Sequence, residues 1–260
     1  MGLVIGTYGS VPYIHLQLEA WRRHCAEMPL LIHEDASPHA GRLRELCAEY
    51  GAEFFGNCAR WGHVPGDLLA YINGLAWARQ AGVELLVKFS RRWIPLTPWQ
   101  AQLGQLAFDS QFATFSGRCL AFGFGFRTEC LAVHVPTWVA TDALRPIRET
   151  LARIGSLDPS LSADQQRVVL VEAVVHRAAQ RAHEVRCVEC EAYESKHPMA
   201  DGCGYYAEWP LLGTNRREPR AHVLWHNASR SQEYHRALIQ WGIDCYAPED
   251  FIDPSANLHG

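Results

Sequence analysis

Residues 3–35 read LVIGTYGSVPYIHLQLEAWRRHCAEMPLLIHED, and this stretch decides the fold. The apolar run Leu3–Thr7 predicts a strand, and Ser10 begins a helix after a short loop. A second apolar run, Pro29–Ile32, predicts the next strand. Between the two strands, apolar residues recur at the spacing that buries one face of a helix: Ile14, Leu18, Trp21 and Cys25. The stretch is therefore a strand–helix–strand unit, which is typical of a parallel sheet.

The same alternation continues to residue 89. A helix is expected from about His39 to Tyr50, followed by a short strand over Ala52–Phe55. The next helix is expected to have Asp67 as its N-cap, to present Leu69, Ile72 and Ala76, and to end near Gly82. A strand is then expected over Val83–Phe89. The last strand is apolar enough to lie at the centre of the sheet. The pattern predicts an α/β protein, a three-layer α/β/α sandwich with a mostly parallel sheet and helices on both faces.

The second half is less regular. Helices are expected from Thr97 to about Phe108, over Asp142–Ile154, and from Ser162 to about Ala182; strands are expected over Phe112–Ser116, Leu131–Val135, Glu184–Cys190 and His222–His226. No linker separates these elements from the first half. We therefore expect residues 1–260 to form a single domain.

Composition excludes several classes of protein. With 48% hydrophobic and 20% charged residues, the chain is globular rather than disordered. A net charge of −4 argues against a nucleic-acid partner. No apolar run approaches 18 residues, and no charged segment precedes the first strand, so neither a membrane span nor a signal peptide is expected. Nine cysteines without a disulfide-framework spacing are expected to be reduced, in a cytoplasmic protein.

Glu34 and Asp35 follow the second strand at its carboxyl end, where open α/β sheets bind ligands. They are suited to accept hydrogen bonds from a ribose or a base edge; the alternative is a solvated turn with a local hydrogen bond. This arrangement resembles the start of the GT-A nucleotide-sugar transferases, especially family 2: a strand, a helix start that contains Pro12, and a second strand that ends in an acidic turn. The resemblance covers residues 1 to about 90 well and the remainder loosely.

The resemblance implies transfer of a sugar from a nucleotide diphosphate sugar to the hydroxyl of a glycan or another acceptor. It implies a nucleotide-binding half, residues 1–95, and an acceptor-side half, residues 96–260. The residues that it assigns to the nucleotide are Thr7, Tyr8, Gly9, Glu34 and Asp35.

The fourth strand departs from the family, which places a metal-binding D-x-D motif there. This chain has Lys88-Phe89-Ser90-Arg91-Arg92 instead, without a carboxylate. Basic side chains can neutralise a departing diphosphate without a divalent metal such as Mn or Mg, and a guanidinium binds phosphate oxygens in pairs. Lys88, Ser90, Arg91, Arg92 and His226 are therefore the candidate diphosphate ligands. The alternative is that the basic residues pair with surface acids.

Asp164 is the candidate catalytic base, because inverting transferases need a carboxylate to deprotonate the acceptor hydroxyl. The resembling family places this base at the start of a helix, as Ser162-Ala163-Asp164-Gln165 does here. The alternative is that Asp164 only complements the helix dipole, with Asp142 and Glu129 as the other carboxylates available.

Two further groups suggest weaker hypotheses. Cys187, Cys190, His197 and Cys203 have the residue types of a structural zinc site, although buried thiols are the preferred interpretation. Trp61, Trp93, Trp209 and Trp225 fall in or beside predicted loops, where rings can stack on a sugar; most tryptophans, however, serve packing.

Two competing functions stay open. The first is a non-catalytic binding or assembly module on the same fold, which the missing D-x-D motif favours. The second is a nucleotidyltransferase, but that class calls for a basic Gly-rich loop after the first strand, and Thr7-Tyr8-Gly9-Ser10 has no basic residue.

Overall fold

The computed structural model of the chain describes residues 1–9, 11–90, 93–95, 100, 112–114, 128, 130–155, 171–182, 193–194, 206–208, 221–223, 239, 241–243 and 245–247. The first half alternates strands and helices: β1 (Gly2–Thr7), α1 (Val11–His24), β2 (Leu30–Glu34), α2 (Ala40–Tyr50), β3 (Glu53–Gly56), α3 (His63–Gln80) and β4 (Leu85–Ser90). The later elements are β5 (Trp93–Pro95), β6 (Phe112–Thr114), β7 (Cys130–His134), α5 (Val135–Ala140), α6 (Arg145–Gly155), α8 (Val171–Ala182), β8 (Tyr193–Glu194), β9 (Tyr206–Glu208) and β10 (Ala221–Val223).

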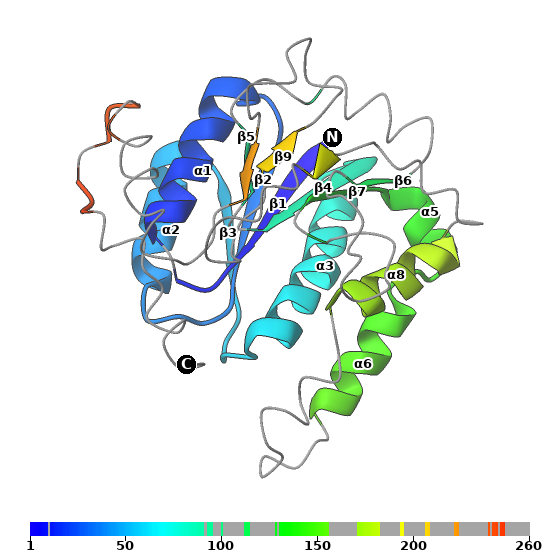
Figure 1. The fold of residues 1–260 in the computed structure, drawn as a ribbon. Helices are drawn as coiled ribbons and strands as arrows, with labels where there is room; N and C mark the ends of the chain where they lie inside the picture. Colours follow the sequence, from blue (N-terminus) through cyan, green and yellow to red (C-terminus); the bar gives the residue numbers. More distant parts are fainter. Residues whose placement is uncertain are drawn as a thin grey trace.

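The main sheet has six strands in the order β3-β2-β1-β4-β7-β6. Strands β3, β2, β1 and β4 are parallel, whereas β7 is antiparallel to β4 and β6 is antiparallel to β7. Helices α1 and α2 cover one face, and α3, α5, α6 and α8 lie on the other (Figure 1). The expected three-layer α/β/α sandwich with a mostly parallel sheet is confirmed, including the central place of β4.

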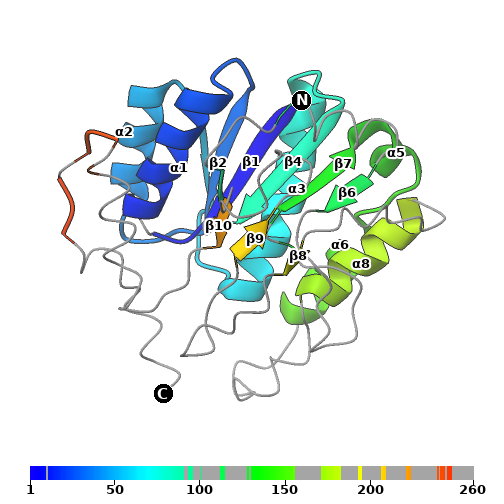
Figure 2. The same ribbon diagram turned by 45° about the horizontal axis from the view of Figure 1, so that its top comes forward.

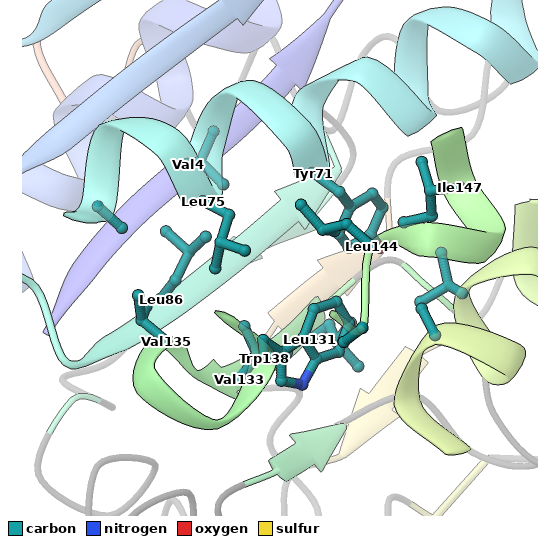
Figure 3. Close-up of a cluster of buried hydrophobic side chains, with 14 of the residues drawn as sticks. Val4, Tyr71, Leu75, Leu86, Leu131, Val133, Val135, Trp138, Leu144 and Ile147 are labelled. Carbon is teal, nitrogen blue, oxygen red and sulfur yellow. The ribbon is translucent and has the colours of Figure 1, made fainter. Parts of the chain in front are cut away.

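Side-chain alternation along the strands builds the two hydrophobic layers. Leu3 and Ile5 of β1 pack with α1 and α2, whereas Val4 between them packs toward α3. Figure 3 shows the second layer, in which Val4 and Leu86 from the sheet face Tyr71 and other side chains of the helices. Lys88 lies two residues after Leu86 and therefore shares the α3 face of the sheet.

Helix α3 differs from its predicted form. It begins at His63 with Gly62 as the N-cap, so the prediction that Asp67 caps it is wrong. Its buried residues include Leu68, Ala70, Tyr71, Leu75 and Ala78, whereas Leu69 and Ile72 are half-buried and Ala76 is exposed. The buried face is set by close packing on β1, where a Cβ at Gly74 would lie 3.0 Å from a methyl carbon of Val4.

Other element boundaries also differ from expectation. Strand β2 continues to Glu34, so this acid belongs to the strand rather than to the following turn. Helix α6 begins at Arg145 instead of Asp142, and α5 lies between β7 and α6, where no helix was predicted. Asp142 has a φ angle of +52°, which a helix interior does not allow. Apart from Gln100, the predicted helix at 97–108 lies outside the described residues, as does the predicted strand at 184–190.

A second sheet has the order β5-β10-β9-β8, with antiparallel pairs. Strand β5 begins three residues after β4 ends, so this sheet starts from the carboxyl end of β4. Figure 2 shows β9 and β10 next to each other, and the pairing of β10 with β5 brings β10 near the carboxyl end of β4. Residues far apart in the sequence therefore meet near this edge, where His222 of β10 is opposite Ile94 of β5.

Tyr246, near the C-terminus, contacts His15 of α1. The Tyr246 hydroxyl and Nδ1 of His15 are 3.0 Å apart, and Nε2 of His15 lies 3.0 Å from the Tyr50 hydroxyl. Tyr50 in turn donates to the buried carboxylate of Glu19. Among the described helices, none is both long and apolar enough to cross a membrane.

Candidate functional site

The carboxyl ends of the parallel strands are level with one another. Thr7 of β1 is opposite Glu34 of β2, and Gly6 is opposite Ser90 of β4. The Asp35 amide donates to the Thr7 carbonyl at 3.0 Å, which extends the ladder into the acidic turn. The structure thus brings together Thr7, Glu34, Asp35 and Ser90 at one edge of the sheet.

Glu34 is fully buried and holds two loops together. Its Oε1 accepts from the Gly9 amide at 3.1 Å, across the β1–α1 loop. The Ser37 amide donates to both carboxylate oxygens, at 3.0 and 3.1 Å. Gly9 has a φ angle of +64°, a conformation that glycine adopts without strain. Glu34 therefore fixes the backbone of the loop that was predicted to contact a base.

Ala36 follows the acidic pair with a φ angle of +54°. This left-handed conformation is unfavourable for a residue with a Cβ and costs about 1 kcal/mol. The Ser37 amide, one residue later, donates to Glu34, and this contact holds the strained turn in place.

Asp35 binds the loop between β3 and α3. Its Oδ1 accepts from Asn57 Nδ2 at 2.8 Å and from the Trp61 amide at 3.0 Å, and its Oδ2 accepts from the Gly62 amide at 2.9 Å. The carboxylate is 4% exposed and presses on Gly66, where a Cβ would lie 2.7 Å from Oδ2. The Trp61 amide also donates to Oδ2 at 3.2 Å, so three donors make four hydrogen bonds to this buried carboxylate. Asp35 therefore fixes the backbone of the β3–α3 loop.

Tyr8 and Arg60 meet across the two loops. The Arg60 guanidinium carbon lies 4.3 Å from the centre of the Tyr8 ring, within the range of a cation–π interaction. Arg60 is exposed, and Tyr8 is half-buried. Trp61, next to Arg60, is 46% exposed. An aromatic ring, a guanidinium and an indole thus gather beside the acidic turn.

Lys88 lies on the α3 face of the sheet, two residues before Ser90 at the carboxyl end of β4. It is 2% exposed, and its Nζ lies 2.5 Å from Oδ1 of Asp67 in the first half of α3. The ammonium also lies 4.9 Å from the centre of the Tyr71 ring. Gly6 leaves room for this pair, because a Cβ there would lie 3.2 Å from the Cβ of Ala70 and 3.6 Å from Asp67 Oδ1. The charge of Lys88 is therefore already paired inside the protein.

His33 is a second buried polar side chain on this face of the sheet. It is 1% exposed, with Nε2 2.9 Å from Asn73 Nδ2, and its ring stacks on Phe55 at 5.5 Å. Burial lowers the pKa of His33 to about 4, against the opposing effect of Asp35 and Asp67. His33 is therefore neutral near pH 7, and its hydrogen bond helps to position β2 against α3.

Ser90 contributes its backbone at this edge. The Ser90 carbonyl accepts from Gln17 Nε2 of α1 at 2.8 Å, which holds the end of β4 against that helix. The other candidate diphosphate ligands, Arg91, Arg92 and His226, lie outside the described residues, as does the candidate base Asp164.

The remaining candidates are placed only in part. Asp142 lies in the turn between α5 and α6 and pairs with Arg148, which lowers its pKa. Since β7 ends opposite Leu85, the first residue of β4, α5 starts from the edge opposite the acidic turn. Candidates outside the described residues are Glu129, Cys187, Cys190, His197, Cys203, Trp209 and Trp225. Within the described part, no three His, Cys, Asp or Glu side chains form a potential metal site.

Three residues of this edge escaped the sequence analysis: Asn57, Arg60 and Asp67. Asp67 was taken for an N-cap, although the buried lysine at position 88 indicated that a carboxylate partner was needed. Asn57 follows an edge strand at the same level as Asp35, which was a usable signal. No sequence pattern identified Arg60, because its contact with Tyr8 joins loops that are 52 residues apart.

Comparison with solved structures finds partial similarity to transferases. The glycosyltransferase GlyE of Streptococcus pneumoniae TIGR4 is 11% identical, with 67% of this chain and 42% of GlyE covered and a TM-score of 0.44. S. aureus TarS 1-349 in complex with UDP-GlcNAc is 13% identical, with 55% of this chain and 47% of TarS covered and a TM-score of 0.40. A cytidylyltransferase from Leptospira borgpetersenii is 12% identical, with 55% of this chain and 63% of the cytidylyltransferase covered and a TM-score of 0.38.

This chain spans less than two thirds of the length of each of these proteins. The sequence matches no protein-family model and no curated protein. Glycosyltransferases are thus among the solved proteins that the chain resembles, over part of their length.

Proposed function

We propose that this protein is a glycosyltransferase of the GT-A type that transfers a sugar from a nucleotide diphosphate sugar to an acceptor hydroxyl. The observation that carries the proposal is the edge at which Glu34 and Asp35 hold two loops beside the end of β4. Polar ligands bind α/β sheets at this edge. Residues 1–95 would bind the donor, and residues 96–260 would supply the acceptor side.

The nucleoside is proposed to lie against Thr7, Tyr8 and Gly9. Glu34 acts by fixing the Gly9 amide, and Asp35 acts by fixing the loop that carries Arg60 and Trp61 beside the proposed nucleoside position. Tyr8 is half-buried and presents an aromatic surface suited to a planar base. In this proposal Tyr8 contacts the base, while Glu34 and Asp35 position the loops around it.

The diphosphate is proposed to lie beyond Ser90, with Arg91, Arg92 and His226 around it. The basic side chains neutralise the leaving group in place of a divalent metal, because the end of β4 has no carboxylate to hold one. The ion pair between Lys88 and Asp67 holds β4 against α3 near this edge. The proposed reaction is therefore independent of Mn and Mg.

Chemistry is proposed to proceed by direct displacement with inversion. Asp164 takes the proton of the acceptor hydroxyl as its oxygen forms the bond to the anomeric carbon. The bond from that carbon to the diphosphate breaks in the same step, and the basic residues hold the departing nucleoside diphosphate. An inverted anomeric configuration in the product tests this step directly.

A thermal-shift screen of uridine, guanosine, thymidine and cytidine diphosphates, with manganese or with EDTA, tests donor binding. One nucleotide should stabilise the protein by about 2.7 kcal/mol at a hundredfold excess over its Kd, with EDTA making no difference. Asp35→Ala should remove most of the shift, and Arg42→Ala, on the outer side of α2, should not. If no nucleotide raises the melting temperature, the transferase proposal fails.

The same screen separates catalysis from binding alone. A binding or assembly module would show the nucleotide shift but would neither transfer nor hydrolyse the sugar of the matching nucleotide sugar. Release of nucleoside diphosphate from that sugar donor, measured over hours with and without mixed glycan acceptors, decides between the two.

A further inference from the structure

Arg60 is an exposed cation at the candidate site that the sequence analysis did not assign. It belongs to the β3–α3 loop, and the two residues after it donate their amides to Asp35. The backbone next to Arg60 is therefore fixed, while its side chain reaches across to Tyr8. Tyr8 is likewise next to a fixed residue, because Gly9 donates to Glu34.

One acidic dipeptide thus positions both partners of the Tyr8–Arg60 contact. Their separation of 4.3 Å spans the two loops at the carboxyl edge, and Tyr8 follows β1, the strand that pairs with β4. An exposed cation–π contact changes an equilibrium constant by only a few-fold. A ligand phosphate can therefore compete with the Tyr8 ring for the guanidinium at small cost.

The charges at this edge distinguish Arg60 from Lys88. Lys88 is buried and paired with Asp67, so a phosphate would have to replace that carboxylate. Arg60 is exposed, and within the described part of the chain no carboxylate pairs with it. A guanidinium also offers two parallel N–H donors to a phosphate, which an ammonium cannot.

We propose that Arg60 is a phosphate-binding residue of the donor site, resting on Tyr8 in the free protein and moving to a phosphate of the nucleotide diphosphate when the base takes its place on the ring. This inference rests on the proposed function and adds to it the residue that couples base binding to phosphate binding. The aromatic face of Tyr8 is covered by Arg60 until a nucleotide supplies both a base and a phosphate.

The test compares Arg60→Met with Arg44→Met. Arg44 makes a similar contact, 5.1 Å from the centre of the Phe54 ring, but lies on α2 away from the acidic turn. Calorimetry would measure the Kd of the nucleoside diphosphate that gives the largest thermal shift, and the Kd of the matching nucleoside. Arg60→Met should weaken the diphosphate at least tenfold and leave the nucleoside unchanged or up to a few-fold tighter. Arg44→Met should change neither.

Salt provides a second measurement. Between 50 and 200 mM NaCl, the wild-type affinity for the diphosphate should fall more steeply than that of Arg60→Met, because one charge contact is missing in the variant. Equal weakening of nucleoside and diphosphate by Arg60→Met, or no weakening, would overturn the role of Arg60 while nucleotide binding by the wild type preserved the proposed function. If the wild type binds none of the four nucleotides, both are wrong.

Discussion

Replacing Gly66 with alanine tests how firmly Asp35 is held in the candidate site. The new Cβ would lie 2.7 Å from Asp35 Oδ2 and 2.8 Å from its Cγ, distances that real Cβ atoms do not tolerate. The carboxylate cannot turn away freely, since three donors surround it. Moving Oδ2 away from the Trp61 and Gly62 amides would cost about 1.5 kcal/mol for each charged hydrogen bond.

The expected net effect follows from two opposing contributions. The lost hydrogen bonds cost about 3 kcal/mol, and alanine in a helix recovers about 1 kcal/mol relative to glycine. Gly66→Ala should therefore lower the free energy of unfolding by about 2 kcal/mol. The matched control is Gly41→Ala in α2, which is exposed and has no atom within 4 Å of its added Cβ, so it should gain about 0.5–1 kcal/mol.

Urea denaturation of both variants gives the comparison, and a double-mutant cycle with Asp35→Ala identifies the cause. In the Asp35→Ala background the two closest atoms are gone, so the additional cost of Gly66→Ala should disappear. Gly66→Ala should also lose the thermal shift with nucleoside diphosphate. A Gly66→Ala variant as stable as Gly41→Ala, or additive effects in the cycle, would refute the reasoning.

Four further predictions address other parts of the edge. Burial lowers the pKa of His33 to about 4, so on acidification the unfolded chain binds a proton at this residue before the folded protein does. The free energy of unfolding should therefore keep its full value above pH 6.5 and fall by about 3 kcal/mol as the pH falls to 4. Urea denaturation across that range should show a smaller fall for His33→Gln. Lys88→Met should lower the free energy of unfolding by about 3 kcal/mol, because the Asp67 carboxylate loses its partner. The double variant with Asp67→Leu should lose less stability than the sum of the two single variants. Additive losses in urea denaturation would contradict the pairing. Ala36→Gly should raise the free energy of unfolding by about 0.5–1 kcal/mol, since glycine relieves the left-handed backbone, and a destabilised variant would speak against this strain. Asp164→Asn should reduce turnover about 10²–10⁴-fold in a sugar-transfer assay with little change in donor Kd; near-normal turnover would place the base elsewhere.

The parts of the fold that sequence predicted well share a local cause. The buried residues of α1, such as Ile14 and Leu18, were predicted because one helix face repeats every 3.6 residues. The end of α2 was equally clear, as Gly51 adopts the left-handed conformation that terminates helices. Boundaries were predicted less well where the local signal competes with packing, as at Asp67, whose side chain binds Lys88 instead of capping α3.

The candidate site shows the same division. That Glu34 and Asp35 lie at a carboxyl edge could be predicted from their place after a strand in a βαβ unit. Their partners could not, because Gly9, Asn57 and the Trp61 amide come from loops whose approach depends on the assembled sheet.

For residues 1–90, the sequence by itself determined the order of strands and helices, their parallel pairing and the edge at which polar residues collect. Hydrophobic periodicity is sufficient for this, because each element buries its own apolar face. Only the tertiary structure decided that Lys88 faces Asp67 and that Arg60 rests on Tyr8. Such contacts depend on the distance between elements far apart in the chain, which sheet order and helix packing set together.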